Sequence, residues 1–216
     1  TYHGLETLNL ALGSGSDVLN IRGTVPVTNI SLGNGDDRVY VSSTADVAIG
    51  GRPEFLAGDL DGIQGTLNLD LGSGRHTLLI SDEGTDVGDG STAAPVLVTD
   101  VAADAIARDA DLAPVAGNFV LGEIFVVGLA PAGISYRAAA DGTFADGIRV
   151  WSGAGADTFL VNGTHDRNGV RTTTWLNTGL GDDVLSVDLQ ASEDGFFVLN
   201  TQGPNDNVLH LSLIHI

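Results

Sequence analysis

The sequence contains no cysteine, no methionine and no lysine, and these absences exclude several kinds of site. Without cysteine, neither a disulfide framework nor a zinc–thiolate centre can form. Without lysine, the chain has no P-loop for nucleotide phosphates. All nine basic residues are arginines, against 28 acidic residues, so the formal net charge is −19. This balance argues against nucleic acid and anionic membranes as partners and suits a protein that takes up cations.

Aromatic residues are also scarce, at 6% of the chain, and the longest apolar run, near Ile124–Val127, is far too short to cross a bilayer. We therefore expect no membrane insertion. An acidic, aromatic-poor composition can indicate disorder. Here 43% of the residues are hydrophobic, and they follow a regular pattern, which favours a folded protein with a real core.

A short glycine–aspartate motif recurs along the chain and defines its organisation. The five copies are Leu12-Gly-Ser-Gly-Ser-Asp17, Leu32-Gly-Asn-Gly-Asp-Asp37, Leu71-Gly-Ser-Gly-Arg-His76, Ser152-Gly-Ala-Gly-Ala-Asp157 and Thr178-Gly-Leu-Gly-Asp-Asp183, and Thr201-Gln-Gly-Pro-Asn-Asp206 is a loosened sixth. The first glycines of the first three copies are residues 13, 33 and 72, which indicates a unit of about 20 residues.

Alternating apolar residues flank the motif in each unit, as Leu8 and Leu10 do before the first copy and Leu19 and Ile21 after it. This period of two predicts a strand, a tight turn and a second strand. One such unit cannot bury its apolar face alone, so we expect the units to stack. Asparagines that share one offset before the motif, Asn9, Asn29 and Asn68, are expected to form a hydrogen-bonded ladder.

At these glycines and aspartates the chain resembles the hemolysin-type calcium-binding repeats of RTX toxins and secreted metalloproteases. The resemblance implies a parallel β-roll that binds calcium and folds outside the cell. The family repeats every nine residues and binds ions on both sides, whereas a repeat near 20 predicts that only one edge carries sites. Together with the strand pattern, this predicts an all-β, right-handed parallel β-helix or β-roll-like solenoid with coils of about 20 residues and one irregular excursion.

Calcium is also the ion that these turns suit chemically. It takes six to eight oxygen ligands, and glycine turns expose backbone carbonyls beside an aspartate. Acidic turns stacked about 5 Å apart would repel one another without a cation. The candidate ligands are Gly13, Gly15, Asp17, Gly33, Gly35, Asp36, Asp37, Gly153, Gly155, Asp157, Gly179, Gly181, Asp182 and Asp183. The alternative is that each Gly–Asp turn only bends the chain.

Other candidate residues carry weaker signals. In the third motif, Arg75 and His76 replace the acids, which argues against an ion there and favours a pair with a neighbouring carboxylate. We interpret Asp82, Asp86 and Asp89 as a solvated acidic loop. Trp151 and Trp175 are expected to be strand aromatics, with sugar-stacking platforms as the alternative.

The repeat divides the chain into a first module at 1–80, an acidic and alanine-rich excursion at 81–133, a second, truncated module at 134–210 and a tail at 211–216. Ser42–Ile63 is expected to hold a degenerate coil and a loop, and residues 100–111 a short helix. The tail matches the translation of a sequencing-library adapter, so His215 carries no functional weight. We expect the chain to be one part of a much longer protein.

The expected function is that of a calcium-stabilised structural segment of a secreted or cell-surface protein, such as a stalk or spacer. One alternative is an adhesin module that binds surface glycans or other copies of the repeat. The other is the non-catalytic part of a secreted polysaccharide-active enzyme. We expect no catalysis by the chain itself, because repeated acids at structural positions do not single out a catalytic pair and no Gly-x-Ser-x-Gly or His-Glu-x-x-His motif occurs.

Overall fold

A computed structural model describes residues 4–100, 123–166, 172–190, 193–203 and 205–213. They form strands and no helix. The spatial order of the nine-stranded sheet is β1 (Thr7–Ala11), β3 (Val27–Ser31), β5 (Leu67–Asp70), β9 (Ile134–Arg137), β8 (Ile124–Val127), β7 (Val96–Thr99), β11 (Thr158–Val161), β13 (Val184–Leu189) and β15 (Asn207–Leu213). The six-stranded sheet contains β14 (Phe196–Asn200), β12 (Thr173–Asn177), β10 (Ile148–Trp151), β6 (Thr77–Ser81), β4 (Arg38–Val41) and β2 (Val18–Ile21).

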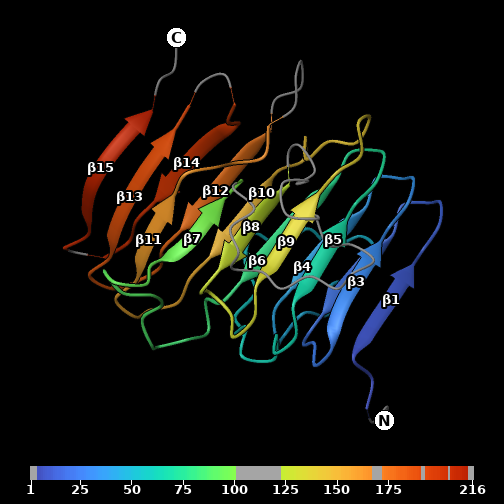
Figure 1. The fold of residues 1–216 in the computed structure, drawn as a ribbon, viewed down its shortest axis with the longest axis horizontal. Coiled ribbons are helices and arrows are strands. Elements are labelled where there is room, and N and C mark those ends of the chain that lie inside the picture. Colours follow the sequence, from blue (N-terminus) through green and yellow to red (C-terminus); the bar gives the residue numbers. More distant parts are fainter. Residues whose placement is uncertain (1–3, 101–122, 167–171, 191–192, 204, 214–216) are drawn as a thin grey trace.

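The two sheets face each other, and the chain passes from one to the other at almost every connection (Figure 1). Neighbouring strands are parallel, except that β8 runs antiparallel to β7 and β9. The all-β class with parallel sheets is thus confirmed. Both sheets are open, and the ends of the chain lie at opposite ends of the long axis in Figure 1.

The core lies between the sheets because alternate residues of each strand point inward. Ile30, Leu69 and Tyr136 occupy one such inward column of the nine-stranded sheet and are buried. Leu78 and Val150 are among the residues that face them from the six-stranded sheet. The alternation in the sequence predicted these inward positions correctly, whereas Leu8 and Leu10 of the first coil remain exposed, at 42% and 37%.

The segment at 81–133 does not leave the sheets entirely, because it contributes β7 and β8 to the nine-stranded sheet, between β9 and β11. Most of the helix expected at residues 100–111 lies outside the described residues. Within the described part of the chain, no helix is long and apolar enough to cross a membrane.

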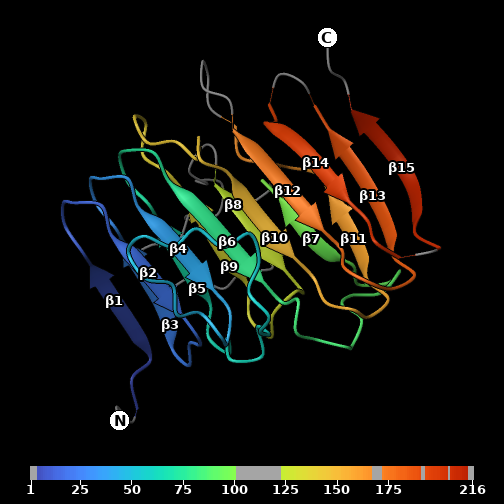
Figure 2. The same ribbon diagram turned by 180° about the vertical axis from the view of Figure 1, so that it is seen from behind.

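Residues 42–59, which we call the strap, cross the outer face of the six-stranded sheet (Figure 2). Leu60 and Ile63, which follow it, belong to the core between the sheets. Asn20 on β2 exchanges two hydrogen bonds with the backbone of Val47. The Trp151 indole on β10 donates to the carbonyl of Glu54, at 2.8 Å. Tyr40 and Leu79 are buried beneath the strap.

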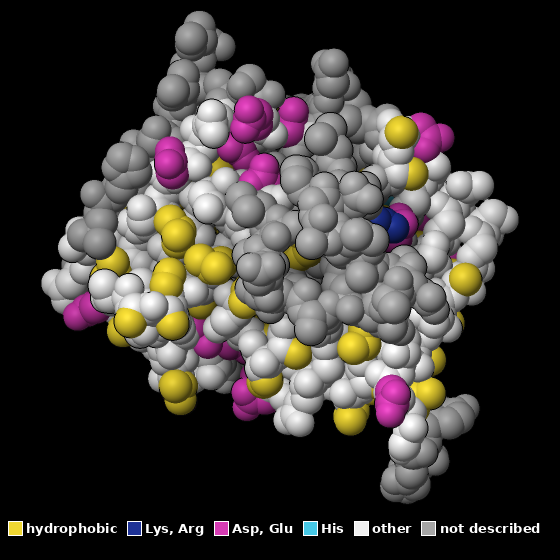
Figure 3. All heavy atoms as spheres, in the orientation of Figure 1, with side chains coloured by type: hydrophobic (Ala, Val, Ile, Leu, Met, Phe, Trp, Pro, Cys, Tyr) yellow, Lys and Arg dark blue, Asp and Glu magenta, His cyan; other side chains and the backbone are white. Residues whose placement is uncertain are grey.

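The motif turns lie at two opposite edges of the molecule. The first three lead from the nine-stranded to the six-stranded sheet, after β1, β3 and β5, at the upper edge in Figure 1. The turns at 153–157 and 179–183 lead in the reverse direction, after β10 and β12, at the lower edge. The expectation of a single edge is therefore wrong. Figure 3 shows acidic side chains along both edges of the visible face.

Candidate functional site

The motif turns stack directly on one another, backbone against backbone. Residue 34 forms a parallel bridge with Ser14 on one side and with Ser73 on the other. Glycine is required by this contact, since a Cβ on Gly35 would lie 2.0 Å from the carbonyl oxygen of Gly15. The φ angle of Gly35 is +149°, which other residues rarely adopt. The repeated glycines therefore serve close stacking of the coils.

The other candidate glycines have the same environment wherever a preceding coil is present. An added Cβ would come within 2.2 Å of a neighbouring backbone or side-chain atom at Gly33, Gly153, Gly155, Gly179 and Gly181. At Gly13 and Gly15, in the first coil, it would meet nothing within 4 Å.

At the upper edge, the last residue of the second and of the third motif accepts a hydrogen bond from the backbone of the preceding coil. Asp37 Oδ1 accepts from the N–H of Asp17, at 2.9 Å. His76 Nδ1 accepts from the N–H of Asp37, at 3.3 Å. The side chains of Asp37 and His76 are completely buried. The expected adjacency of Asp17 and Asp37 is confirmed, and their carboxylates belong to a hydrogen-bond ladder that runs from coil to coil.

The lower edge carries an equivalent ladder. The N–H of Asp89 donates to Asp157 Oδ1 at 2.7 Å, that of Asp157 to Asp183 Oδ1 at 2.9 Å, and that of Asp183 to Asp206 Oδ1 at 3.1 Å. Asp206, from the loosened sixth motif, thus occupies the regular position. A parallel stack needs an acceptor for each of these inward N–H groups, and the aspartate provides it.

Asp89 is a member of this ladder that sequence reasoning missed. Its interpretation as part of a solvated loop is wrong, because its N–H bonds to Asp157 and its carboxylate is half-buried. The same interpretation is wrong for Asp82, which is only 4% exposed and accepts a hydrogen bond from the N–H of Leu60 at 2.5 Å, whereas Asp86 is exposed. The turn that ends at Asp89 has Thr85 at the position of the first glycine of the motif, and Thr85 contacts Gly153 of the next coil. The remaining signal was Gly88-Asp89, which repeats the last glycine and the aspartate without the usual spacing.

The buried position of these aspartates disfavours their charged form. Burial raises the pKa of Asp157 to about 6, and it also raises the pKa values of Asp37 and Asp183. Both oxygens of Asp157 are used, since Oδ2 accepts a hydrogen bond from the hydroxyl of Ser152 at 2.5 Å. In contrast, Oδ2 of Asp37 is buried without a hydrogen-bond partner and lies 3.5 Å from His76 Nδ1.

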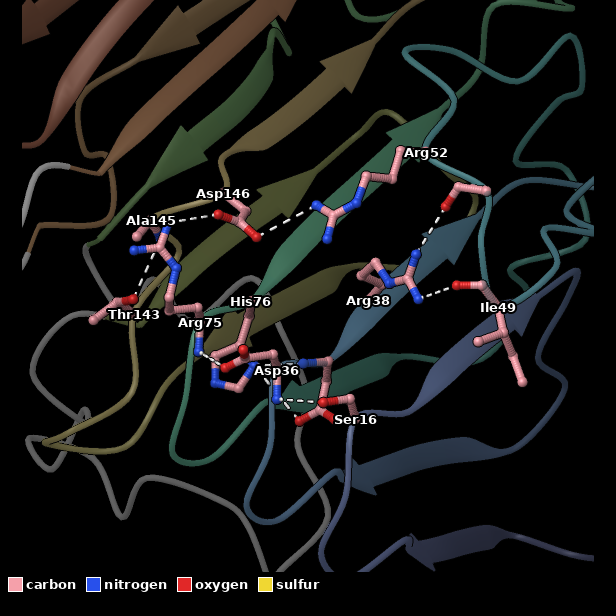
Figure 4. A network of polar contacts seen from close by, with 12 residues as sticks. Ser16, Asp36, Arg38, Ile49, Arg52, Arg75, His76, Thr143, Ala145 and Asp146 are labelled. Carbon is pink, nitrogen blue, oxygen red and sulfur yellow. Dashed lines mark hydrogen bonds and ion pairs between the residues drawn. The ribbon is translucent and has the colours of Figure 1, made fainter.

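The third motif replaces both acids, and each replacement has a defined partner (Figure 4). The Arg75 guanidinium pairs with Asp146 at 2.7 Å, and Arg52 from the strap pairs with the other oxygen of Asp146 at 3.4 Å. The prediction that a cation here pairs with a carboxylate is confirmed. His76 Nε2 lies 3.2 Å from the carbonyl of Gly72, so Nδ1 is the acceptor, and burial lowers the pKa of His76. A neutral imidazole thus takes the role of the carboxylate in this coil.

The remaining candidates, Asp36 and Asp182, precede the buried ladder residues and are exposed. Asp36 Oδ1 accepts from the N–H of Arg75 at 2.9 Å, and Asp182 Oδ1 accepts from the amide of Asn205 at 3.0 Å. Within the described chain, no group of three or more acidic or histidine side chains has a metal-binding arrangement. A calcium ion at these turns would therefore share carboxylates that already bind backbone, and Oδ2 of Asp37 and of Asp183, which have no hydrogen-bond partner, are the oxygens best able to serve it.

A second ladder, of amides, runs along the outer face of the nine-stranded sheet. Asn29 Nδ2 donates to Asn9 Oδ1 at 2.8 Å, and Asn68 Nδ2 donates to Asn29 Oδ1 at 2.7 Å. The hydroxyl of Ser135 continues the row by donating to Asn68. The predicted asparagine ladder is confirmed.

The two tryptophans have different surroundings. Trp151 contacts the strap through its hydrogen bond to the carbonyl of Glu54 and through the ring of Phe55, whose centroid lies 5.7 Å from that of the indole. Trp175 lies beyond the strap, with Arg149 over its ring. No protein-family model, curated protein or solved structure matches the chain.

Proposed function

We propose that this chain is a structural segment of a larger extracellular protein, a right-handed parallel β-helix with coils of about 20 residues whose acidic turns bind calcium, as its resemblance to RTX repeats implies. The observation that carries the proposal is the pair of carboxylate ladders, in which each coil repeats one hydrogen bond to the next.

The repeated contacts support a spacer whose length depends on the number of coils. Each turn contacts only its neighbours along the stack, as bridges at Ser14, Asn34 and Ser73 illustrate. In such an architecture stability is close to a sum of coil and interface contributions, so coils can be added without redesign. The commitment of both Asp157 oxygens to Asp89 and Ser152 also favours a structural role for these acids over a catalytic one.

The electrostatic repulsion between carboxylates of stacked turns supports calcium binding. Two carboxylates about 5 Å apart repel by about 3 kcal/mol at an effective dielectric constant of about 20. The burial that raises the pKa of Asp37 adds to this cost. A divalent ion shared by Asp17, Asp36 and Asp37 would offset both, and Oδ2 of Asp37 has no other partner. At the lower edge the corresponding acids are Asp157, Asp182 and Asp183.

Thermal unfolding in EDTA, in calcium and in magnesium tests this function. We expect calcium at about 100 times its dissociation constant to add about 2.7 kcal/mol to the free energy of unfolding. Magnesium should substitute poorly, because it requires a smaller octahedral shell. An unchanged melting profile after calcium addition would refute the proposed ion.

A matched pair of variants separates the site from general charge effects. Asp17→Asn with Asp37→Asn keeps an amide acceptor for the ladder but removes two charges, so the calcium-induced stabilisation should be largely lost. Asp86→Asn removes an exposed charge that belongs to no ladder contact, and it should leave the calcium effect intact. Equal loss in both variants would contradict the assignment of the site.

A further inference from the structure

The outer face of the six-stranded sheet is only partly covered. The strap lies over Asn20, Tyr40 and Leu79 on β2, β4 and β6, and reaches Trp151 on β10. Beyond it, Arg149, Trp175 and Val198 form one row across β10, β12 and β14, according to the strand register. This row, together with Phe196 and Asn200, is called the Arg149 patch below.

Arg149 differs from the other described arginines in having neither a carboxylate nor a backbone carbonyl as a partner among the described residues. Ion pairs join Arg22 to Asp46, Arg52 and Arg75 to Asp146, and Arg137 to Asp70, while Arg38 binds carbonyls of the strap. Among the described residues, Arg149 has only its contact with Trp175, its guanidinium carbon lying 4.8 Å from the ring centroid. In a chain with a net charge of −19, an arginine that remains without a carboxylate is available to an outside acid.

The tryptophan holds this guanidinium in place. A Cβ on Gly147 would lie 2.3 Å from Cζ3 of Trp175, so the indole rests against the glycine and is fixed on the strand. A cation over an indole is attracted to its π-system, which limits the orientations of the guanidinium. Its N–H groups remain free to donate to a planar acceptor such as a carboxylate.

The surroundings add groups that suit a sugar ring. Val198 and Phe196 are each 41% exposed and provide an apolar surface beside the tryptophan. Asn200 is exposed and donates its amide to Asn177 Oδ1 at 3.0 Å, which leaves its own Oδ1 as an acceptor for a hydroxyl. A fixed cation, an apolar floor and an amide oxygen are the groups that a pyranose with a carboxylate needs.

We propose that the Arg149 patch binds a carboxylated saccharide, such as a uronic acid residue of a polysaccharide. The carboxylate pairs with Arg149, the apolar face of the ring lies on Val198 and Phe196, and a hydroxyl donates to Asn200. Densely charged polyanions such as nucleic acids are disfavoured, because the patch offers one cation in a strongly acidic protein. This site is independent of the calcium proposed at the turns.

Fluorescence titration with trigalacturonate tests the proposal, with the methyl ester of the same trisaccharide as control. Trp151→Phe leaves Trp175 as the only indole, so the signal reports on the patch. We expect the acid to bind at millimolar or lower concentration and the ester to bind on the order of tenfold more weakly, because the ester lacks the charge-assisted hydrogen bonds.

Two arginine variants complete the test. Arg149→Gln should weaken binding of the acid about tenfold while leaving the melting temperature unchanged. Arg22→Gln, which removes an exposed arginine paired with Asp46 at 3.5 Å, should bind as the parent does. Calcium bridging between the sugar and the acidic turns would be insensitive to Arg149. Absence of binding, equal affinity for acid and ester, or equal behaviour of both variants would overturn the proposal.

Discussion

Substitutions of Asp157 separate the two roles that its carboxylate can have, as a hydrogen-bond acceptor and as a charge. Asp157→Ala removes the acceptor of both the Asp89 N–H, at 2.7 Å, and the Ser152 hydroxyl, at 2.5 Å. Ser152 is fully buried, and Asp157 is only 1% exposed, so water cannot replace the lost contacts without rearrangement. Each unsatisfied buried group costs about 1–3 kcal/mol, so the loss in the free energy of unfolding should be about 2–6 kcal/mol for the two groups.

Asp157→Asn should behave in the opposite way when no calcium is present. The asparagine Oδ1 still accepts from Asp89, and its amide can donate to Ser152 Oγ. The neutral side chain also avoids the burial that raises the pKa of Asp157 from 3.8 to about 6, a shift that corresponds to about 3 kcal/mol against the charged form. We therefore expect the asparagine variant to be at least as stable as the parent in EDTA at pH 7.

Urea unfolding followed by circular dichroism, in EDTA and in calcium, measures these differences. Asp188→Ala on β13 is the control, because this exposed acid makes no ladder contact and should change stability by less than about 0.5 kcal/mol. If the alanine and asparagine variants lose the same stability in EDTA, the ladder bond is not what holds the coils together. If Asp157→Asn responds to calcium as fully as the parent, Asp157 is not a ligand.

Three further predictions concern single groups of the stack. Tyr136→Phe should stabilise the protein by about 1 kcal/mol in calorimetry, because the tyrosine hydroxyl is buried without a hydrogen-bond partner; destabilisation would contradict this. Gly35→Ala should prevent or strongly impair folding, since its Cβ would lie 2.0 Å from Gly15 O, whereas Gly50→Ala, with open space around it, should melt near the parent temperature. In EDTA, the free energy of unfolding should fall as the pH rises from about 4 to about 6. Burial raises the pKa of Asp157 to about 6, so in this range the native state keeps a proton that the unfolded chain releases. A free energy of unfolding that rises across this range in urea titrations would refute the assignment.

The strand positions and the contacts between adjacent coils could be predicted because they depend on local sequence. Alternating leucines identify inward positions, and an equal offset of Asn9 and Asn29 is sufficient to place the two amides in register. The same reasoning placed Asp17 beside Asp37. These predictions needed only the period of a strand and the spacing of the motif.

The sequence could not predict that the motif turns move from the upper edge of the molecule to the lower edge. A turn from the nine-stranded to the six-stranded sheet has the same glycine–aspartate sequence as a turn in the reverse direction, so the motif does not reveal its edge. The change accompanies β7, β8 and β9, three consecutive strands of one sheet, and none of them carries the motif. Asp89 was missed for a related reason, because the neighbour that identifies it, Asp157, is distant in sequence.

The ladders also limit where calcium can bind. A carboxylate that accepts one backbone N–H still has a second oxygen, so ladder and ion are compatible where that oxygen is free, as in Asp37. They compete at Asp157, where Ser152 occupies the second oxygen. In the next coil of the upper edge, the neutral imidazole of His76 continues the ladder without adding a negative charge. Oδ2 of Asp183 is likewise buried without a hydrogen-bond partner. The steps that end at Asp37 and Asp183 are therefore where calcium should have its largest effect, and a protein of this kind should bind fewer ions than it has motif turns.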